Sequence, residues 1–314
     1  MNTYGEKFKL SIFGESHGTA IGVVIDGLPT GFAPDMDKVA QEMARRAPGQ
    51  SETATARTES DAVEIVSGLF EGKTTGAPLC GMIRNTNTQS GDYRRNLPRP
   101  GHADYTAHIK YKGFSDYRGG GHFSGRLTAP LVFAGALAKQ LLQGVTITAE
   151  VSAIEGKPPC DETIINVKAD GDSVGGVIYC VAEGLPTGLG EPFFGSVESR
   201  LSALLFSIPA VKAVEFDDGF SLADMRGSQS NRTAFGILGG ITTGQPLRFR
   251  VAVKPTPSIA KEQDTVDLET NQTVKITVKG RHDPCIVPRA LPVVEAVTAI
   301  ALLDLWLLGG FPLQ

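Results

Sequence analysis

Segments with the two-residue period of β-strands alternate along the whole chain with segments of helical period. Leu247, Phe249, Val251 and Val253 alternate with other residues, as in a strand with one buried face. Between residues 127 and 141, Leu and Ala recur at three- and four-residue spacing, which predicts a helix. Further strands are predicted near residues 8–12, 21–25, 63–65, 145–151, 174–181 and 274–278, and further helices near 35–46, 197–208 and from Pro292 onward.

This mixture of periods predicts an α+β fold. The 314 residues contain no Pro/Ser-rich linker, so we expect a single domain over residues 1–314. Strands with one apolar face have to cover that face, and the predicted helices are available to do so. We therefore expect a single domain with a β-α-β sandwich-like arrangement of antiparallel sheets and helices.

The composition argues against nucleic acid and membrane as partners. Net charge is −4 at pH 7, so bulk electrostatics attracts neither nucleic acid nor an anionic membrane. The most apolar stretch, residues 291–308, is short for a membrane span and contains Glu295 and Asp304, which predicts a buried helix. The cysteines form no CxxC pair and the N-terminus lacks an apolar signal core, so a reducing cytoplasm is the expected location.

Most of the histidines lie in short segments flanked by Gly, Asp or Ser. These histidines are His17, His102, His122 and His282, and the arginines near such segments are Arg99, Arg118, Arg126, Arg281 and Arg289. Imidazole titrates near neutral pH, guanidinium binds carboxylates and phosphates, and glycine lets the backbone approach a ligand. Together they predict one site for an anionic substrate that needs proton transfer.

Each motif taken alone also has a purely structural interpretation. Residues 14–18 (GESHG) can form a tight turn with a solvated histidine. Residues 99–105 (RPGHADY) can be a loop held by an Arg–Asp pair, although their His and Asp are spaced to be oriented together. The glycines at 119–121 precede a helix N-terminus, which suits an anion but is also a common turn.

Each of the remaining basic segments, taken alone, also has both a functional and a structural interpretation. Arg45 and Arg46 close a predicted helix, where positive charge is favoured in any case. Residues 254–259 (KPTPSI) can bind a phosphate through lysine and hydroxyls or form a surface turn. Residues 279–285 (KGRHDPC) place a carboxylate beside two basic side chains, as in active sites and in structural ion-pair networks.

The joint order of these motifs resembles the chorismate synthase family. The resemblance covers nearly the whole chain, and its specificity comes from the order of the motifs rather than from any single one. Besides the segments above, it includes Pro48-Gly49 after the two arginines and residues 67–72 (SGLFEG), 188–192 (GLGEP) and 236–241 (GILGGI).

This resemblance implies an enzyme of the shikimate pathway. The implied activity is that of a carbon–oxygen lyase: a 1,4-anti elimination of phosphate from 5-enolpyruvylshikimate-3-phosphate that gives chorismate. It also implies a requirement for reduced FMN, although the overall reaction is redox-neutral. Some family members reduce their own flavin with NADPH, so the source of electrons stays open. A cytoplasmic homotetramer acting on a small anionic substrate is implied as well.

The resemblance also implies roles for individual residues. His17 and His102 would be the acid/base histidines, one helping phosphate to leave and one protonating reduced flavin. Asp283 would lie near the reactive flavin nitrogen and take part in removing the ring proton. The implied substrate ligands are Ser16, Arg45, Arg46, Arg99 and Arg281. The implied cofactor contacts are Arg46, His122, Phe123, Ser124, Pro209, Ala210, Gly239, Lys254, Pro255, Thr256, Pro257, Ser258 and Arg281.

The chain departs from the common family pattern in a few places. Glu52 replaces a frequent arginine, Asn87 replaces a common aspartate, and His122 and Phe123 replace the Arg-Ser pair of the family's GGGRSSAR segment. The chain is also short between Cys160 and Asp172 and between Ser228 and Gly236. The second of these regions is implied to cover the flavin, so its shortness bears on cofactor affinity.

Two other functions are compatible with the same residues. A flavin-dependent oxidoreductase would use the same FMN pocket for net hydride transfer, and a non-catalytic anion-binding protein would use the arginines without turnover. An elimination consumes no reductant stoichiometrically, so phosphate release with chemically reduced FMN separates the lyase from the oxidoreductase. Absence of flavin binding would favour the non-catalytic protein.

Overall fold

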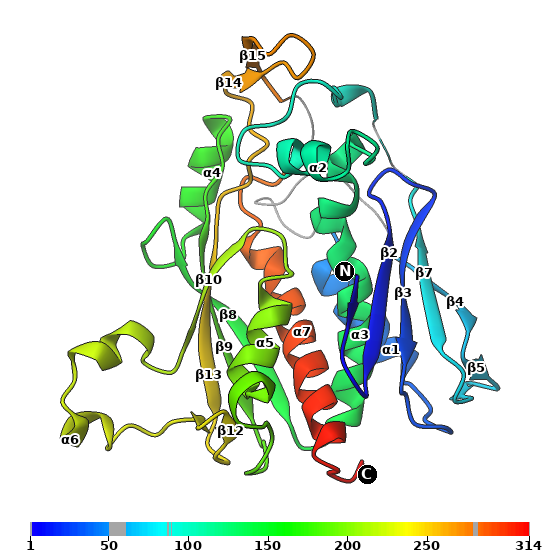
Figure 1. The fold of residues 1–314 in the computed structure, drawn as a ribbon, viewed down its shortest axis with the longest axis vertical. Helices are drawn as coiled ribbons and strands as arrows, with labels where there is room; N and C mark the ends of the chain where they lie inside the picture. Colours follow the sequence, from blue (N-terminus) through cyan, green and yellow to red (C-terminus); the bar gives the residue numbers. More distant parts are fainter. Residues whose placement is uncertain (1, 50–60, 87, 89, 279–281, 314) are drawn as a thin grey trace.

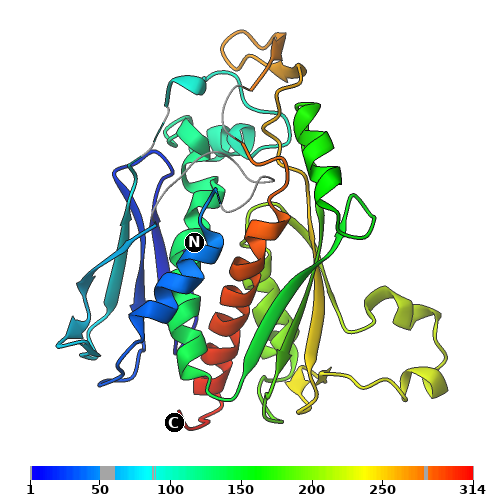
Figure 2. The ribbon, with the colours of Figure 1, turned by 180° about the vertical axis from the view of Figure 1, so that it is seen from behind.

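Two antiparallel sheets enclose a layer of helices (Figures 1 and 2). The computed structural model describes residues 2–49, 61–86, 88, 90–278 and 282–313. The helices lie between the two sheets and pack against both of them. The α+β class and the β-α-β sandwich expected from the sequence are therefore confirmed.

The two sheets consist of strands that pair with antiparallel neighbours. The first has the order β1 (Thr3–Tyr4), β2 (Lys9–Gly14), β3 (Ala20–Asp26), β7 (Leu79–Arg84) and β4 (Val63–Ser67). The second has the order β10 (Val211–Phe216), β13 (Leu247–Val253), β9 (Gly176–Glu183) and β8 (Thr146–Ile154). Three small hairpins are β5–β6 (Leu69–Phe70, Lys73–Thr74), β11–β12 (Ile237–Leu238, Ile241–Thr242) and β14–β15 (Gln263–Val266, Thr273–Ile276).

Four α-helices form the central layer. They are α1 (Met36–Arg46), α3 (Thr128–Leu141), α5 (Val197–Leu205) and α7 (Val287–Leu308). Three shorter α-helices lie outside it, namely α2 (Asp104–Lys110), α4 (Asp161–Ala169) and α6 (Gly227–Ser230). Short 3-10 turns complete the list: η1 (Ser90–Asp92), η2 (Arg118–Phe123), η3 (Gly125–Leu127), η4 (Phe193–Gly195) and η5 (Gly219–Asp224).

Strand β13 shows why the sheets need the helices. Its apolar residues at 247, 249, 251 and 253 are all buried, while the intervening residues are more exposed. Each large apolar side chain buried in this way contributes about 1.5–3 kcal/mol relative to an exposed one. The face that these side chains share must therefore be covered, and α5 and α7 lie on that side of the sheet.

Helix α7 is the central element of the core. By length and composition alone this helix could cross a membrane, but most of its apolar stretch, 78%, is buried inside the protein. Its burial agrees with the core helix expected from the sequence. Two acidic residues on it are buried as well, and one of them, Asp304, accepts hydrogen bonds from the backbone N–H groups of residues 6–8. This carboxylate thus fixes the N-terminal segment to the core.

Helices α3 and α7 cross in close contact at Gly135. A Cβ atom placed on Gly135 would lie 2.3 Å from the Cβ atom of Ala296 and 2.4 Å from its Cα atom. Two small residues therefore allow the helices to approach, and a larger side chain on either one would push them apart.

Several details differ from the sequence predictions, and neither β10 nor α4 was predicted. Helix α7 begins at Val287 rather than near Pro292, because Pro288 occupies its first turn and Pro292 is accommodated inside the helix. Strand β7 was not predicted, since Gly81 interrupts its apolar pattern; a side chain there would collide with the Phe133 ring. The stretch from 85 to 121, in which no element was predicted, contains α2 and two 3-10 turns.

Candidate active site

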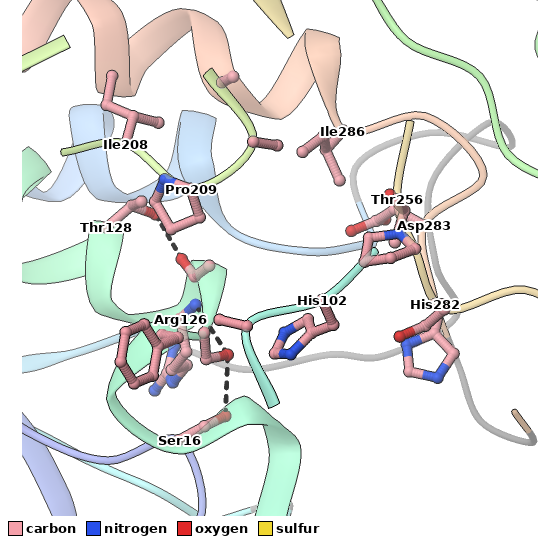
Figure 3. A pocket seen from close by; sticks show the side chains of 18 of the residues that line it. Ser16, His102, Arg126, Thr128, Ile208, Pro209, Thr256, His282, Asp283 and Ile286 are labelled. Carbon is pink, nitrogen blue, oxygen red and sulfur yellow. Dashed lines mark hydrogen bonds between the residues drawn. The ribbon is translucent and has the colours of Figure 1, made fainter. Parts of the chain in front are cut away.

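A cavity of about 680 Å³ lies where α7 begins, between the ends of the two sheets. Segments far apart in the sequence line it, and Figure 3 shows Ser16, His102, Thr256 and Asp283 around the same space. The predicted residues that line it are Ser16, His17, Arg46, Arg99, His102, His122, Phe123, Ser124, Pro209, Ala210, Lys254, Thr256, Pro257, Ser258 and Asp283. The three predicted catalytic residues therefore share one chamber.

The first histidine, His17, is held in the turn that follows β2. Its Nδ1 atom lies 2.9 Å from Ser90 Oγ, within hydrogen-bonding distance. The neighbouring Ser16 N–H donates to the carbonyl of Gly121 at 3.0 Å. A Cβ atom on Gly119 would lie 2.4 Å from His17 Cδ2, so glycine is needed for the backbone to pass this ring.

The second histidine, His102, is oriented by a carboxylate. Its Nδ1 atom lies 2.6 Å from Asp104 Oδ1, and Arg99 binds the same carboxylate through Nε at 2.7 Å. Burial alone would raise the pKa of Asp104, but the hydrogen bonds from Arg99 and His102 outweigh it and hold this pKa well below its usual range. The Arg–Asp pair thus exists, as the structural interpretation proposed, and it also fixes His102.

The most buried cation of the cavity, Arg46, is surrounded by other cations. It ion-pairs with Asp61 at 2.6 Å, and Arg126 binds the other oxygen of the same carboxylate. Burial lowers the pKa of Arg46 to about 10; Asp61 opposes this effect, and repulsion from Arg289 and Arg126 adds to it. One carboxylate therefore binds two buried guanidiniums.

The cavity as a whole carries an excess of positive charge. The basic side chains that line it are Arg46, Arg99, Arg126, Lys212, Lys254 and Arg289. Among the described lining residues, Asp283 is the one carboxylate, and Asp61 and Asp104 lie behind the wall. In a partly dehydrated chamber this excess favours an anionic ligand with several negative charges.

The predicted catalytic carboxylate, Asp283, is bound by Arg289 on the first turns of α7. Arg289 forms an ion pair with Asp283 Oδ2, and its Nε atom donates to the backbone carbonyl of Arg46 at 3.3 Å. One guanidinium therefore connects the segment before α7 to the end of α1. This contact fixes Asp283 against the cavity wall.

The glycine-rich turn presents its backbone to the cavity. Gly119, Gly120 and Gly121 have φ values of 60°, 82° and 54°, a left-handed geometry that other residues adopt only with strain. The following His122 places Nδ1 2.7 Å from the carbonyl of Gly14 and Nε2 3.2 Å from Asn2 Oδ1. Both ring nitrogens thus bind protein oxygens, so any ligand contact of this segment falls mainly on its backbone.

The segment after β13 supplies polar atoms from the other side. Lys254 Nζ donates to the carbonyl of Gly101 at 2.6 Å, and Arg99 donates to Ser258 Oγ at 3.1 Å. Burial, with repulsion from Lys212, lowers the pKa of Lys254. Thr256 Oγ1 is buried and has no hydrogen-bond partner within the part of the chain that the structure describes. Such an atom in a cavity wall is suited to a polar ligand.

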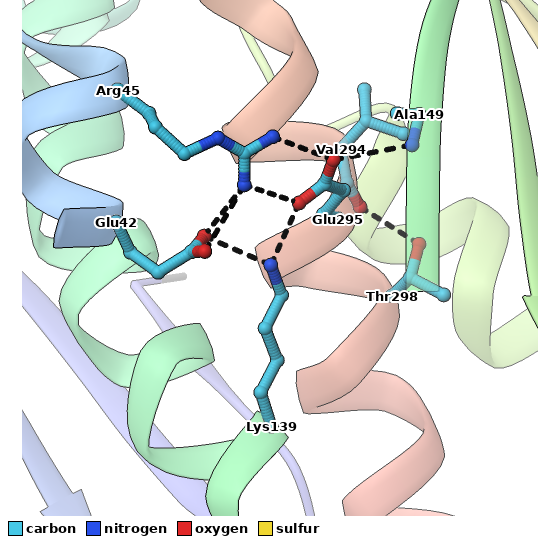
Figure 4. A network of polar contacts seen from close by, with 7 residues as sticks. All are labelled: Glu42, Arg45, Lys139, Ala149, Val294, Glu295 and Thr298. Carbon is cyan, nitrogen blue, oxygen red and sulfur yellow. Dashed lines mark hydrogen bonds and ion pairs between the residues drawn. The ribbon is translucent and has the colours of Figure 1, made fainter. Parts of the chain in front are cut away.

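Arg45 does not reach the cavity. Its guanidinium binds Glu295 at 2.7 and 2.8 Å and Glu42 at 3.0 Å, and Lys139 binds both of these acids (Figure 4). The α-helical turn directs residues 45 and 46 of α1 to different sides, so one meets Glu295 and the other meets the cavity. The expectation that Arg45 lies near the substrate is corrected accordingly.

Two other predicted residues are also missing from the cavity wall. Gly239 forms the exposed tip of the β11–β12 hairpin with φ of 61°, and Pro255 is outside the lining. Arg281, like Glu52 and Asn87, lies outside the described residues. The shortened segment with η5 and α6 projects beyond the edge of the second sheet, away from the cavity of its own chain (Figures 1 and 2). Within one chain it therefore does not cover the site as expected.

Several lining residues had no role assigned from the sequence. They are Tyr93, Arg126, Thr128, Lys212, His282 and Arg289. Arg126 and Arg289 were visible as arginines close to the histidine segments, which was a usable signal. Tyr93 lies in a stretch without period, and its contacts with the histidine at 17 and the arginine at 99 depend on the tertiary structure.

Comparison with known proteins identifies the family. The sequence profile of chorismate synthase matches residues 8–307. The chain belongs to the chorismate synthase family. The chorismate synthase of Chitinophaga pinensis is 48% identical, with 98% of this chain and 97% of that protein covered. That of Methanocaldococcus jannaschii is 42% identical, with 99% and 97% covered.

A solved structure supports the same assignment. A crystal structure of chorismate synthase superimposes with a TM-score of 0.72 and 26% identity, and covers 97% of this chain and 93% of that one. Family membership makes the chain an enzyme, a lyase that acts on a phosphate-bearing substrate. The cationic cavity is the site in this fold suited to such a substrate.

Proposed function

We propose that the chain converts 5-enolpyruvylshikimate-3-phosphate to chorismate by 1,4-anti elimination of phosphate, with reduced FMN as cofactor. The observation that carries this proposal is the meeting of His17, His102 and Asp283 in one cavity whose basic side chains outnumber its acids. The substrate bears a phosphate and two carboxylates, so its charge complements that excess.

The substrate's anionic groups would bind on the arginine side of the cavity. Arg46 and Arg99 are both nearly buried, at 4% and 7% exposure, and Ser16 lines the same cavity. A phosphate leaving a ring carbon gathers negative charge as the C–O bond breaks. Buried guanidiniums already in place stabilise that charge without reorganisation of water.

The residues present suit reduced FMN. The left-handed glycine turn brings its backbone to the cavity wall at Gly119, and the buried Thr256 Oγ1 offers a hydroxyl that lacks a partner among the described residues. The proposed contacts are His122, Phe123, Ser124, Pro209, Ala210, Lys254, Thr256, Pro257 and Ser258. When bound, reduced flavin supplies an electron transiently and takes it back, which the side chains of the protein cannot do.

The acid/base groups have distinct settings. Asp104 holds Nδ1 of His102, and Arg99 Nη2 lies 3.3 Å from Nε2 of the same ring, so His102 is placed between a carboxylate and a guanidinium. Nδ1 of His17 lies within hydrogen-bonding distance of Ser90 Oγ, so its partner at this ring position is a hydroxyl. We assign protonation of the leaving phosphate and of the reduced cofactor to these two histidines, and acceptance of the ring proton to the Asp283 side.

We further propose a cytoplasmic homotetramer. Four apolar side chains support self-association, since Phe193, Phe194 and Phe220 are 85%, 93% and 88% exposed and Leu238 is 60% exposed in the single chain. Light scattering tests the oligomeric state. NADPH as the source of electrons is tested separately, by following its oxidation under anaerobic conditions with oxidised FMN.

The decisive experiment is an FMN titration with and without the enolpyruvyl substrate, followed by detection of chorismate. Under anaerobic conditions with chemically reduced FMN, we expect many equivalents of phosphate and chorismate per reduced flavin. Consumption of one reductant per turnover would instead indicate a flavin oxidoreductase. Failure to bind FMN in either redox state would contradict the proposal.

A further inference from the structure

The turn at Ser90–Tyr93 contacts both His17 and Arg99. It comprises η1 (Ser90–Asp92) and the residue after it, and the N–H of Tyr93 donates to the carbonyl of Ser90 at 3.4 Å. Tyr93 itself lines the cavity. No role in catalysis follows for this turn from the motifs, because it lies in a stretch without a regular period.

Ser90 determines how the first histidine is held. Its Oγ atom lies 2.9 Å from His17 Nδ1. A hydrogen bond at one imidazole nitrogen fixes the ring orientation and decides which nitrogen is left for proton exchange. Nδ1 of His102 is held in the same way by a carboxylate, 2.6 Å from Asp104 Oδ1. The two histidines therefore have different partners at the same ring position.

Tyr93 adds a second contact to the same ring. Its ring is perpendicular to that of His17, with centroids 5.3 Å apart. The guanidinium of Arg99 lies over the Tyr93 ring, 5.1 Å from its centroid. Perpendicular aromatic pairs and cations over aromatic faces are both attractive geometries. Tyr93 thus contacts an acid/base group and an anion-binding group at once.

The opposite side of His17 is closed by backbone. A Cβ atom on Gly119 would lie 2.5 Å from His17 Nε2, so the glycine turn packs directly against the ring. The imidazole is therefore enclosed by η1 on one side and η2 on the other. We propose that Ser90 and Tyr93 are positioning residues for the elimination: they fix the orientation of the His17 ring, and Tyr93 couples its placement to that of Arg99. This inference rests on the proposed function.

Kinetics of three variants test the proposal. Ser90→Ala should lower kcat by about 2- to 10-fold, the effect of losing one neutral hydrogen bond, with KM within about twofold. Tyr93→Leu should lower kcat by about tenfold and also raise KM, because the ring contacts both His17 and Arg99. Tyr93→Phe keeps the ring and should stay within about twofold of wild type.

The matched control is Tyr179→Leu, which removes a tyrosine from β9 outside the cavity lining. It should leave both kinetic constants near wild type. The proposal is overturned if Tyr93→Leu behaves as wild type, if Tyr93→Phe loses as much as Tyr93→Leu, or if Tyr179→Leu loses as much as Tyr93→Leu.

A spectroscopic measurement separates this inference from the proposed function. In protein with labelled histidine, the His17 ring resonance is assigned from its absence in His17→Gln. The resonance should move when Tyr93 becomes Leu, through loss of the ring current, and stay in place in Tyr93→Phe. An unmoved resonance overturns the positioning role. If the wild type forms no chorismate although the resonance behaves as expected, the proposed function fails and the packing of His17 stands.

Discussion

Two neighbouring arginines of α1 serve two charged regions of opposite character. Arg45 belongs to the Glu295 network, in which two bases, Arg45 and Lys139, meet two acids, Glu42 and Glu295. Arg46 belongs to the cavity, where basic side chains outnumber acids among the lining residues that the structure describes. The balanced network has no charge left for a ligand, whereas the cavity does. Buried charge therefore indicates a binding site only when its partners within the protein are too few.

The two regions also differ in what holds their charges. Burial alone would raise the pKa of Glu295, but hydrogen bonds and charge from Arg45 and Lys139 bring it below its usual value. Burial and the neighbouring arginines lower the pKa of Arg46 instead. The protein thus favours charge on Glu295 and tolerates it on Arg46. We expect substitutions in the network to reduce stability and substitutions in the cavity to reduce turnover.

The largest effect is expected at the two histidines of the cavity. His17→Ala and His102→Ala should each lower turnover by about 10²–10⁴-fold, as for loss of a general acid or base. The measurement is the anaerobic rate of chorismate formation with saturating reduced FMN. The matched control is His108→Ala on α2, outside the cavity lining, which should stay within about twofold of wild type. Near-normal turnover with full flavin loading would exclude an acid/base role.

The next largest effect concerns the network. Glu295→Gln leaves Arg45 and Lys139 with less negative charge, and breaking a buried pair typically costs 3–5 kcal/mol. The Arg45 side chain is 43% exposed, so we expect about 3 kcal/mol, the lower end of that range. Urea unfolding measures the free energy, and turnover per folded molecule should be unchanged. The control Glu150→Gln, on the exposed part of β8, should cost less than about 0.5 kcal/mol.

A loss below about 1 kcal/mol in Glu295→Gln would mean that the network does not stabilise the fold. A parallel loss of turnover per folded molecule would mean that the two regions are coupled through α1. Either result would remove the distinction between Arg45 and Arg46.

For Arg46→Met we expect the opposite of Glu295→Gln: a large loss of activity and a smaller loss of stability. Loss of one charged hydrogen bond to a substrate anion should lower kcat/KM by roughly 10- to 150-fold. Stability should fall by less than in Glu295→Gln, because the pair with Asp61 is lost but Asp61 keeps Arg126 and a crowded cation is removed. Lys139→Met is the comparator, and it should lose stability while kcat/KM stays constant. Unchanged kcat/KM in Arg46→Met would show that this arginine does not bind the substrate.

The sequence predicted the elements better than their boundaries. The alternation in β13 and the repeat in α3 were sufficient to place both elements, since each has a clear period. The early start of α7 was hidden by its two prolines. Strand β7 was not recognised because Gly81 interrupts its apolar pattern. A glycine is needed at this position because the Phe133 ring of α3 packs against it. Local patterns do not record such tertiary requirements.

The site was predicted through the order of its motifs rather than through geometry. His17, His102 and Asp283 were brought together by the fold as expected. The error at Arg45 arose because adjacent basic residues look alike in a sequence, while the acid that captures one of them, Glu295, is 250 residues away. Tyr93 was missed for the same reason, since its partners lie in other segments of the chain.

The smallest expected effect is on the pH dependence of stability. The folded-state pKa of Glu295 lies below its ordinary value of 4.5, so its contribution is present above that value and is lost as pH falls through the folded pKa. Asp61 and Asp104 contribute with the same sign. Wild type should therefore lose stability between about pH 5 and pH 3 in urea titrations. Glutamine does not titrate, so the free energy of unfolding of Glu295→Gln should fall less over the same pH range, although it is lower than that of wild type at neutral pH. Parallel curves for the two proteins would place the acid sensitivity in the carboxylates behind the cavity wall, Asp61 and Asp104, and not in the Glu295 network.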